Sequence, residues 1–173
     1  PIPTSNPTPL VKQVMAFGYL TKMFLEEVIA LAKGDEKTIA HFHEWMASLP
    51  ILDIRREALP IKTIFTTHAT QLGRHLAINS PFFYAHLPFF KWQEEAAKFG
   101  VEAEAAIEFH SAQSCDIFTT VSEVTARECK HLLKRKPHAV LPNGLNIHRF
   151  ETDHEVQKLH SQYKDGIHQF VMA

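Results

Sequence analysis

The sequence predicts an α/β protein with a parallel β-sheet. Short apolar runs rich in β-branched residues, such as 61–66, alternate with longer stretches of helical apolar spacing, such as 102–114. Polar residues begin where several of these runs end, as expected at the carboxyl edge of such a sheet. This alternation favours right-handed crossovers and hence a Rossmann-like three-layer architecture.

Length and composition indicate one soluble globular domain. The chain has 173 residues, of which 45% are hydrophobic and 21% charged, and its formal net charge is −1. This charge balance predicts no basic surface for nucleic acid or for an anionic membrane. Its two cysteines, Cys115 and Cys129, match no disulfide framework or metal signature, so we expect a reducing, cytoplasmic location.

The first half of the chain is expected to form two helices and two strands. Residues 1–9 contain four prolines and predict an extended lead-in. The helix that follows, ended by Gly34, is apolar on most sides, which indicates packing between the sheet and another layer. Its charged residues exclude a membrane span. The elements are a helix at 10–33, a strand at 37–42, a helix at 46–58 and a strand at 61–66. The helix face comprises Val11, Val14, Met15, Gly18, Leu25, Val28 and Ile29, widened by Phe17, Leu20, Phe24 and Leu31.

The second half is expected to continue the alternation. A short helix opens near Thr70, and Ser122 is the expected N-cap of a helix that ends near Arg135. The core contacts predicted for that second helix are Val124, Cys129, Leu132 and Leu133. The other elements are helical pieces at 82–87 and 91–98, a helix at 102–114, strands at 116–121 and 138–141, a turn at 142–144 and a helix at 155–171.

The stretch 63–74 combines a buried strand with a candidate ligand site. Apolar and β-branched residues build the strand, and polar residues, a glycine and an arginine follow it. Helix N-termini at this edge of a parallel sheet offer free N–H groups to a ligand. The sequence therefore predicts a site just beyond this strand.

Four ordered motifs resemble those of the animal and fungal glycogen synthases. They are AHFHEW at 40–45, FTTHATQLGR at 65–74, IFTTVSE at 117–123, and HLLKRKP at 131–137 leading into PNGLN at 142–146. The resemblance extends over nearly the whole chain from about Leu10.

This resemblance implies a glycogen (starch) synthase, a retaining glucosyltransferase of the two-domain GT-B fold. It implies transfer of glucose from UDP-glucose to the non-reducing end of an α-1,4-glucan, with no metal and no cofactor. Residues 10–173 are then expected to be part of the amino-terminal, acceptor-side domain. The carboxyl-terminal nucleotide-binding domain, the first strand and its glycine-rich loop are expected to lie outside this sequence. The chain alone is expected to be inactive, and a homo-oligomer remains open for the longer protein.

The resemblance also assigns roles within the stretch 63–74. Glycosyl transfer develops positive charge on the sugar and negative charge on the leaving diphosphate, and fixed dipoles or cations stabilise both. His68 is assigned as the catalytic residue, with its ring on a sugar hydroxyl and its carbonyl facing the anomeric carbon. Arg74 offers a planar cation to phosphate oxygens. The hydroxyl of Thr67 is assigned to the substrate site.

His43, Glu44 and Trp45 are placed at the lip of the same cleft. The indole could stack on a sugar or be a core aromatic, and Glu44 could contact a ligand or orient backbone amides. Both readings stay open for each residue. His41 and His43 share one face of a strand, but no third metal ligand accompanies them, so a metal site is not expected.

Two further motifs have both a structural and a functional interpretation. Ser122 and Glu123 are explained by a strand-to-helix corner with a serine N-cap. Asn143 and Gly144 could form a tight turn or let the backbone approach a ligand closely.

Three alternatives stay open at this point. One is a starch-synthase-like or sucrose-synthase-like glucosyltransferase, and another is a non-catalytic carbohydrate-binding module. A nicotinamide-dependent dehydrogenase is disfavoured because no Gly-x-Gly-x-x-Gly follows a strand. A sheet without its first strand would expose an edge and apolar helix surface, so we expect the chain alone to self-associate or to be unstable.

Overall fold

The computed structural model describes residues 8–32, 36–145 and 153–172. The chain divides into two units, Pro1–Pro142 and Asn143–Ala173, and each is described by itself. Most of the expected lead-in lies outside the described residues, as does Gly34.

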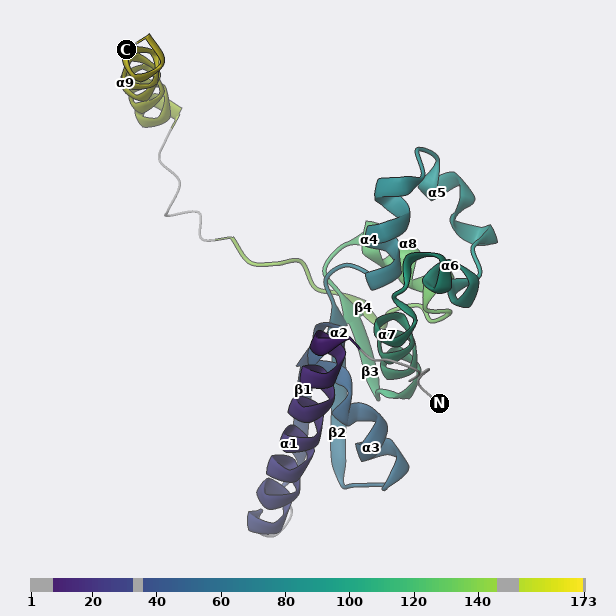
Figure 1. The fold of residues 1–173 in the computed structure, drawn as a ribbon. Helices are drawn as coiled ribbons and strands as arrows, with labels where there is room; N and C mark the ends of the chain where they lie inside the picture. The colour runs from purple at the N-terminus through teal and green to yellow at the C-terminus, as the bar shows by residue number, and fades with distance from the viewer. Residues whose placement is uncertain (1–7, 33–35, 146–152, 173) are drawn as a thin grey trace. The chain divides into compact units, whose positions relative to one another are not determined.

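Unit 1 is organised around a four-stranded parallel sheet (Figure 1). Its strands are β1 (Thr38–His43), β2 (Ile61–Thr67), β3 (Ile117–Thr120) and β4 (Ala139–Val140), hydrogen-bonded in that order. All three strand pairings are parallel. The predicted α/β class with a Rossmann-like parallel sheet is confirmed.

Helices fill the connections between the strands, largely where the sequence predicts them. The helix expected at 102–114 has those bounds, and the expected serine and threonine N-caps are present. The helices of unit 1 are α1 (Pro9–Leu31), α2 (Glu44–Ser48), α3 (Pro50–Arg56), α4 (Gln71–Asn79), α5 (Phe83–His86), the 3-10 turn η1 (Leu87–Phe89), α6 (Trp92–Phe99), α7 (Glu102–Ser114) and α8 (Glu123–Leu132).

The single helix expected at 46–58 is wrong, because the chain forms α2 and α3 there. α2 begins at Glu44, directly after β1, and Leu49 separates the two helices. Pro50 is the first residue of α3, where its missing N–H costs nothing, but the same missing N–H prevents α2 from continuing through it.

The main core lies on one face of the sheet. Phe42, Phe65 and Phe118 occupy paired positions on adjacent strands, and the rings of Phe65 and Phe118 stack at 5.6 Å. Burying such aromatic side chains is the main favourable term in folding. Residues from α1, α3, α7, α8 and their flanks complete this cluster, namely Leu25, Ile51, Ile54, Ala112, Cys115, Cys129 and Leu133.

A second apolar cluster holds α4, α5 and α6 against α7 and α8. Its buried residues are Leu72, Leu76, Phe83, Leu87, Ala96, Val101, Ala105 and Leu132. In Figure 1, α4 and α5 lie beyond the carboxyl ends of β1 and β2. The second cluster therefore fixes α4, the helix that begins within the stretch 63–74.

The opposite face of the sheet is partly open. Ile39, His41 and His43 of β1 are exposed on that face. Towards the carboxyl ends, His41 Nε2 lies 2.7 Å from Thr66 Oγ1, which lies 2.6 Å from Thr119 Oγ1. Unit 1 thus contains two of the expected layers. They are the sheet and the helices that cover the face with Phe42, Phe65 and Phe118.

Two expectations about the core were wrong. Val124 is exposed because the buried face of α8 is set by Thr125, Glu128, Cys129 and Leu132, about 100° away around the helix. The widened apolar face of α1 is also exposed, since the helix packs on one side only. The exposed residues are Phe17, Leu20, Phe24 and Leu31, together with Met15 of the main expected face.

Unit 2 contains one described helix, α9 (Asp153–Met172). Its apolar residues Tyr163, Ile167 and Phe170 are exposed. Residues 143–145 precede it in exposed backbone without helix or strand. Across the described parts of both units, we find no helix with the length and apolarity needed to cross a membrane.

Candidate functional site

The signature loop, residues 67–71, connects β2 to α4. Thr70 is the N-cap of α4, with extended backbone and an Oγ1 that accepts a 3.1 Å hydrogen bond from the Gly73 N–H. The Arg74 N–H donates to the Thr70 carbonyl at 3.1 Å. The helix predicted to open near Thr70 is confirmed, and its N-cap fixes one end of the loop.

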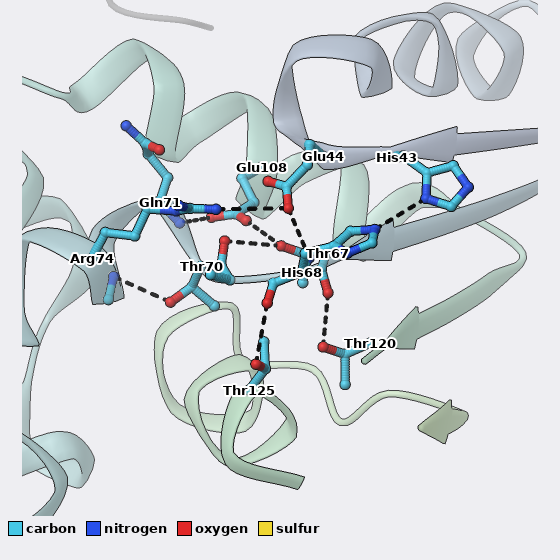
Figure 2. A network of polar contacts seen from close by, with 12 residues as sticks. His43, Glu44, Thr67, His68, Thr70, Gln71, Arg74, Glu108, Thr120 and Thr125 are labelled. Atoms are coloured by element: carbon cyan, nitrogen blue, oxygen red, sulfur yellow. Dashed lines mark hydrogen bonds and ion pairs between the residues drawn. The ribbon is translucent and has the colours of Figure 1, made fainter. Parts of the chain in front are cut away.

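A buried carboxylate from α7 fixes the loop on one side (Figure 2). Glu108 is only 1% exposed. Its Oε1 accepts a 2.8 Å hydrogen bond from the Thr67 hydroxyl, and its Oε2 accepts a 2.7 Å bond from the Gln71 N–H. Burial raises the pKa of Glu108 to about 7, although both hydrogen bonds act in the opposite direction. One carboxylate therefore spans the loop from its first residue to its last.

A second buried carboxylate, from α8, holds the N-cap. Glu128 Oε2 accepts a 2.8 Å hydrogen bond from the Thr70 hydroxyl, and its Oε1 accepts one of 3.1 Å from the Tyr84 hydroxyl. Gly73 faces this contact closely, because a Cβ there would lie 2.2 Å from Thr70 Oγ1 and 2.6 Å from Glu128 Oε2. The glycine of the motif is thus required by packing.

Glu44 joins the end of β1 to the same loop. Its Oε1 accepts a 2.9 Å hydrogen bond from the His68 N–H and lies 3.8 Å from Nη2 of Arg74. Its backbone has a φ of 62°, a left-handed conformation that costs a residue with a side chain about 1–2 kcal/mol. The structure therefore shows Glu44 orienting a backbone amide, one of the two readings left open by the sequence.

His68 is held from several directions and remains half-exposed (Figure 2). Its N–H donates to Glu44, and its carbonyl accepts a long hydrogen bond, 3.4 Å, from the Thr125 hydroxyl. Its ring Nε2 lies 3.2 Å from Nδ1 of His43. The backbone of His68 is therefore fixed while its ring stays accessible.

His43 connects this ring to the open face of the sheet. The rings of His41 and His43 lie 4.2 Å apart, and burial together with the charge of His43 lowers the pKa of His41. An open hollow of about 400 Å³ between α1 and α2 is lined in part by His43 and Phe17. His43 thus stands between this hollow and His68.

Arg74 places its guanidinium outside the loop. Its side chain is 56% exposed, and its nearest recorded charged partner is Glu44, at 3.8 Å. This distance is too long for a strong hydrogen bond, so the guanidinium retains donors for a second, anionic partner.

Comparison with known proteins identifies the family. The family model described as "Glycogen synthase" matches residues 2–173. This chain belongs to the glycogen synthase family. It is 46% identical over 170 residues to a glycogen (starch) synthase of Neurospora crassa, with 98% of this chain and 24% of that protein covered.

Two further relatives agree with this assignment. The human liver glycogen (starch) synthase is 46% identical over 158 residues, which cover 91% of this chain and 22% of that protein. Glycogen (starch) synthase isoform 1 of Saccharomyces cerevisiae is 43% identical over 171 residues, with 98% of this chain and 24% of the yeast protein covered. The chain spans about a quarter of the length of these glycogen synthases.

Not every predicted site residue reaches the surface. Trp45 is 4% exposed and packs with Val14 and Ile107, so the core reading of its indole is the one observed. Thr67 is fully buried, and its hydroxyl is bonded to Glu108. A direct contact of Thr67 with substrate does not fit this placement, because the hydroxyl faces α7 and not the solvent.

The N–H groups expected to be free at this edge are partly occupied in α4. The N–H of Gln71 is bonded to Glu108 and that of Gly73 to Thr70. These carboxylate and hydroxyl oxygens occupy two of the N–H groups in the first turn of α4 and offset part of its dipole, which weakens this terminus as an anion site.

The remaining predicted residues lie apart from the loop or in unit 2. Ser122 accepts a 3.1 Å hydrogen bond from the Thr125 N–H, as the N-cap interpretation requires. Glu123 begins α8. Asn143 and Gly144 lie at the start of unit 2, exposed and outside regular structure, and their role stays a prediction.

Sequence reasoning missed the three side chains that hold the loop from helices α7 and α8. They are Glu108, Thr125 and Glu128. No local signal singles out Glu108, since Glu104 and Ser111 are also buried polar residues on the same side of α7.

A search of the described residues for three or more histidine, cysteine, aspartate or glutamate side chains able to hold a metal ion found no such group. Cys115 and Cys129 are free and buried. Burial raises the pKa of both thiols, to about 11 for Cys115, which keeps them protonated and unreactive.

Proposed function

We propose that the whole protein transfers glucose from UDP-glucose to the non-reducing end of an α-1,4-glucan, with retention of anomeric configuration. The proposal rests on membership of the glycogen synthase family and on relatives that carry the name glycogen (starch) synthase. In this proposal, unit 1 is part of the amino-terminal, acceptor-side domain of a GT-B enzyme, and the nucleotide site lies mainly in a carboxyl-terminal domain.

The observation that carries the proposal is the fixed backbone of His68 beside an accessible ring. Its N–H and carbonyl are held by Glu44 and Thr125, while the ring points out beside His43. The imidazole can bond a sugar hydroxyl, and the carbonyl keeps one lone pair for an electron-poor centre. Such preorganised dipoles stabilise a developing oxocarbenium ion without reorganisation during the reaction.

The leaving diphosphate requires positive charge, which Arg74 can supply. The N–H groups of Gln71 and Gly73 are already bonded, whereas the exposed guanidinium of Arg74 in α4 has donors available for phosphate oxygens. Glu44, 3.8 Å away, would orient the guanidinium. No metal or cofactor is needed for this arrangement, and the proposed location is the cytoplasm.

The reaction would occur only with both domains present. Unit 1 offers His68 and Arg74, but a donor bound on one side alone would remain open to water. We therefore propose that the 173-residue chain alone has no measurable transferase activity.

The test is an assay of the full-length protein with glycogen and either UDP-glucose or ADP-glucose, beside the isolated chain. We expect glucose transfer from UDP-glucose, an α-configured product by NMR, and no transfer by the chain alone. Preference for ADP-glucose would favour a starch-synthase-like enzyme. Glucan binding without turnover of any nucleotide sugar would contradict the enzyme and favour a carbohydrate-binding module.

A further inference from the structure

The signature loop contains no acidic residue, yet two glutamates from distant helices are buried against it. Glu108 is 41 residues from its partner Thr67, and Glu128 is 58 residues from its partner Thr70. Both side chains are nearly inaccessible, at 1% and 8% exposed. Burying a carboxylate is unfavourable unless its oxygens are satisfied, so their placement calls for a reason.

Glu108 closes the loop across His68. Its two oxygens bond Thr67 on one side of His68 and Gln71 on the other. The planar carboxylate fixes the separation of its two partners, so the three residues between them have little freedom. Thr67 is also held from β3, because the Thr120 hydroxyl donates to its carbonyl at 2.8 Å.

Glu128, from α8, fixes the end of the loop at Thr70. It accepts from the Thr70 hydroxyl, the same hydroxyl that caps α4. Its other oxygen accepts from Tyr84, whose carbonyl receives a 3.0 Å hydrogen bond from Arg127. Glu128 therefore ties the N-cap both to α8 and to the segment around α5.

The donors of the loop could in principle be satisfied by neutral acceptors or by water. A carboxyl group offers two oxygens in one rigid plane, which a single hydroxyl or water molecule does not. The two glutamates therefore fix the positions of their partners accurately, as a site that holds a reacting group requires. The residue held between them is His68.

We propose that Glu108 and Glu128 are positioning residues, which set the location of His68 by clamping Thr67, Gln71 and Thr70. The proposal rests on the proposed transferase function, and neither glutamate touches substrate. Loss of one carboxylate leaves a buried hydroxyl, and for Glu108 also a buried N–H, without its acceptor. The loop then shifts to recover hydrogen bonds, and a displacement of about 1 Å at a reacting group lowers turnover on the order of 100-fold.

The experiment uses the full-length protein with Glu108→Ala, Glu108→Gln, Glu128→Ala and the matched control Glu104→Ala. Glu104 lies one turn earlier on α7, is 8% exposed, and makes none of the hydrogen bonds recorded at the loop. Turnover and KM for UDP-glucose and glycogen are measured, together with hydrogen exchange of the loop amides. Exchange reports the clamp directly and does not depend on activity.

Glu108→Gln distinguishes loss of the hydrogen bonds from loss of side-chain volume, because glutamine has nearly the same size as glutamate. Its carbonyl can accept from the Gln71 N–H, and its amide can donate to Thr67, whose hydroxyl can turn to the Ala69 carbonyl, 3.3 Å away. We expect kcat to fall at least about 10-fold in both Ala variants, with KM changed less than about 3-fold, and faster exchange at residues 67–71. Glu108→Gln should recover most of the lost turnover and protection.

Several outcomes would overturn the positioning role. Ala variants that match Glu104→Ala in kcat and in loop exchange would do so, as would a Glu108→Gln variant as impaired as Glu108→Ala. If Glu108→Ala does not fold, Glu108→Gln and Glu128→Ala decide. If the wild-type protein transfers no glucose, the proposed function fails, and loop exchange alone then decides whether the clamp exists.

Discussion

The backbone N–H of His68 donates a 2.9 Å hydrogen bond to Oε1 of Glu44, the residue at which the chain turns from β1 into α2. Glu44 makes this contact from a left-handed backbone conformation, with a φ of 62°. Strain of this kind persists where the surroundings demand it. The contact physically joins two of the motifs that distinguish this family, although they are separated in sequence by a whole crossover.

We expect Glu44→Gly to be more stable than Glu44→Ala. Both changes remove the carboxylate, but only glycine adopts a φ of 62° without steric cost, so it should gain about 1 kcal/mol despite its greater freedom when unfolded. Urea unfolding of the dilute 173-residue chain measures the difference. Equal midpoints, or a more stable Ala variant, would show that Glu44 is not strained.

Gly73→Ala is expected to destabilise the chain, by about 1–3 kcal/mol, against the usual preference for alanine inside a helix. The new Cβ would lie 2.2 Å from Thr70 Oγ1 and 2.6 Å from Glu128 Oε2, so the N-cap and the buried carboxylate must separate. Thermal melts of the two proteins provide the measurement.

Gly166→Ala is the matched control, since Gly166 lies in α9 with no atom within 4 Å of the added Cβ. It should raise helix content or leave it unchanged. If Gly73→Ala is as stable as wild type, Thr70 and Glu128 can move apart without loss of stability, which would contradict this expectation.

The strands and most helices were predictable because their signals are local. Apolar runs, proline and the N-cap residues Thr70 and Ser122 act within a few positions, and the structure has elements at nearly all the expected places. The break at Pro50 was also a local signal, but the periodicity of the surrounding residues concealed it. The exposure of Val124 required the exact phase of α8, which only packing sets.

The candidate site was predictable only in part. The family resemblance pointed to His68 and Arg74. The structure places both at the carboxyl edge of the sheet, where each lies beside Glu44. The partners Glu108 and Glu128 are separated from the loop by 41 and 58 residues, and no local pattern connects them to it. The burial of Trp45 likewise depends on α1 and α7 packing together around it.

The stability of the chain should depend on pH through Glu108. Burial and nearby Glu44 raise its folded pKa to about 7 from an ordinary 4.5, and Arg74 lowers it. Its contribution is then fully present below 4.5 and is lost as the pH rises through about 7. We expect the urea midpoint of Glu108→Gln, relative to wild type, to rise across this window.

Midpoints of the two proteins are compared at pH 4, 5, 6, 7 and 8, values chosen to bracket about 4.5 and about 7. A difference that is constant with pH, or that moves in favour of wild type as the pH rises, would contradict the raised pKa of Glu108.

The exposed apolar face of α1 should make the isolated 173-residue chain self-associate. Phe17, Leu20 and Phe24 are each more than half exposed on this helix, and β1 is an edge strand. Sedimentation should show association that rises with concentration and weakens in a Leu20→Lys, Phe24→Lys double variant. Ala30→Lys, away from that face, is the control, and a monodisperse wild-type monomer would refute the expectation.

The roles of His68 and Arg74 are tested most directly by the kcat of full-length His68→Ala and Arg74→Ala with UDP-glucose and glycogen. His86→Ala and Arg55→Ala are the exposed controls. We expect a loss of at least about 100-fold for His68→Ala and Arg74→Ala, with normal melting, and near wild-type rates for the controls. Rates within about 3-fold of wild type for His68→Ala would contradict the assignment of this loop as the catalytic site.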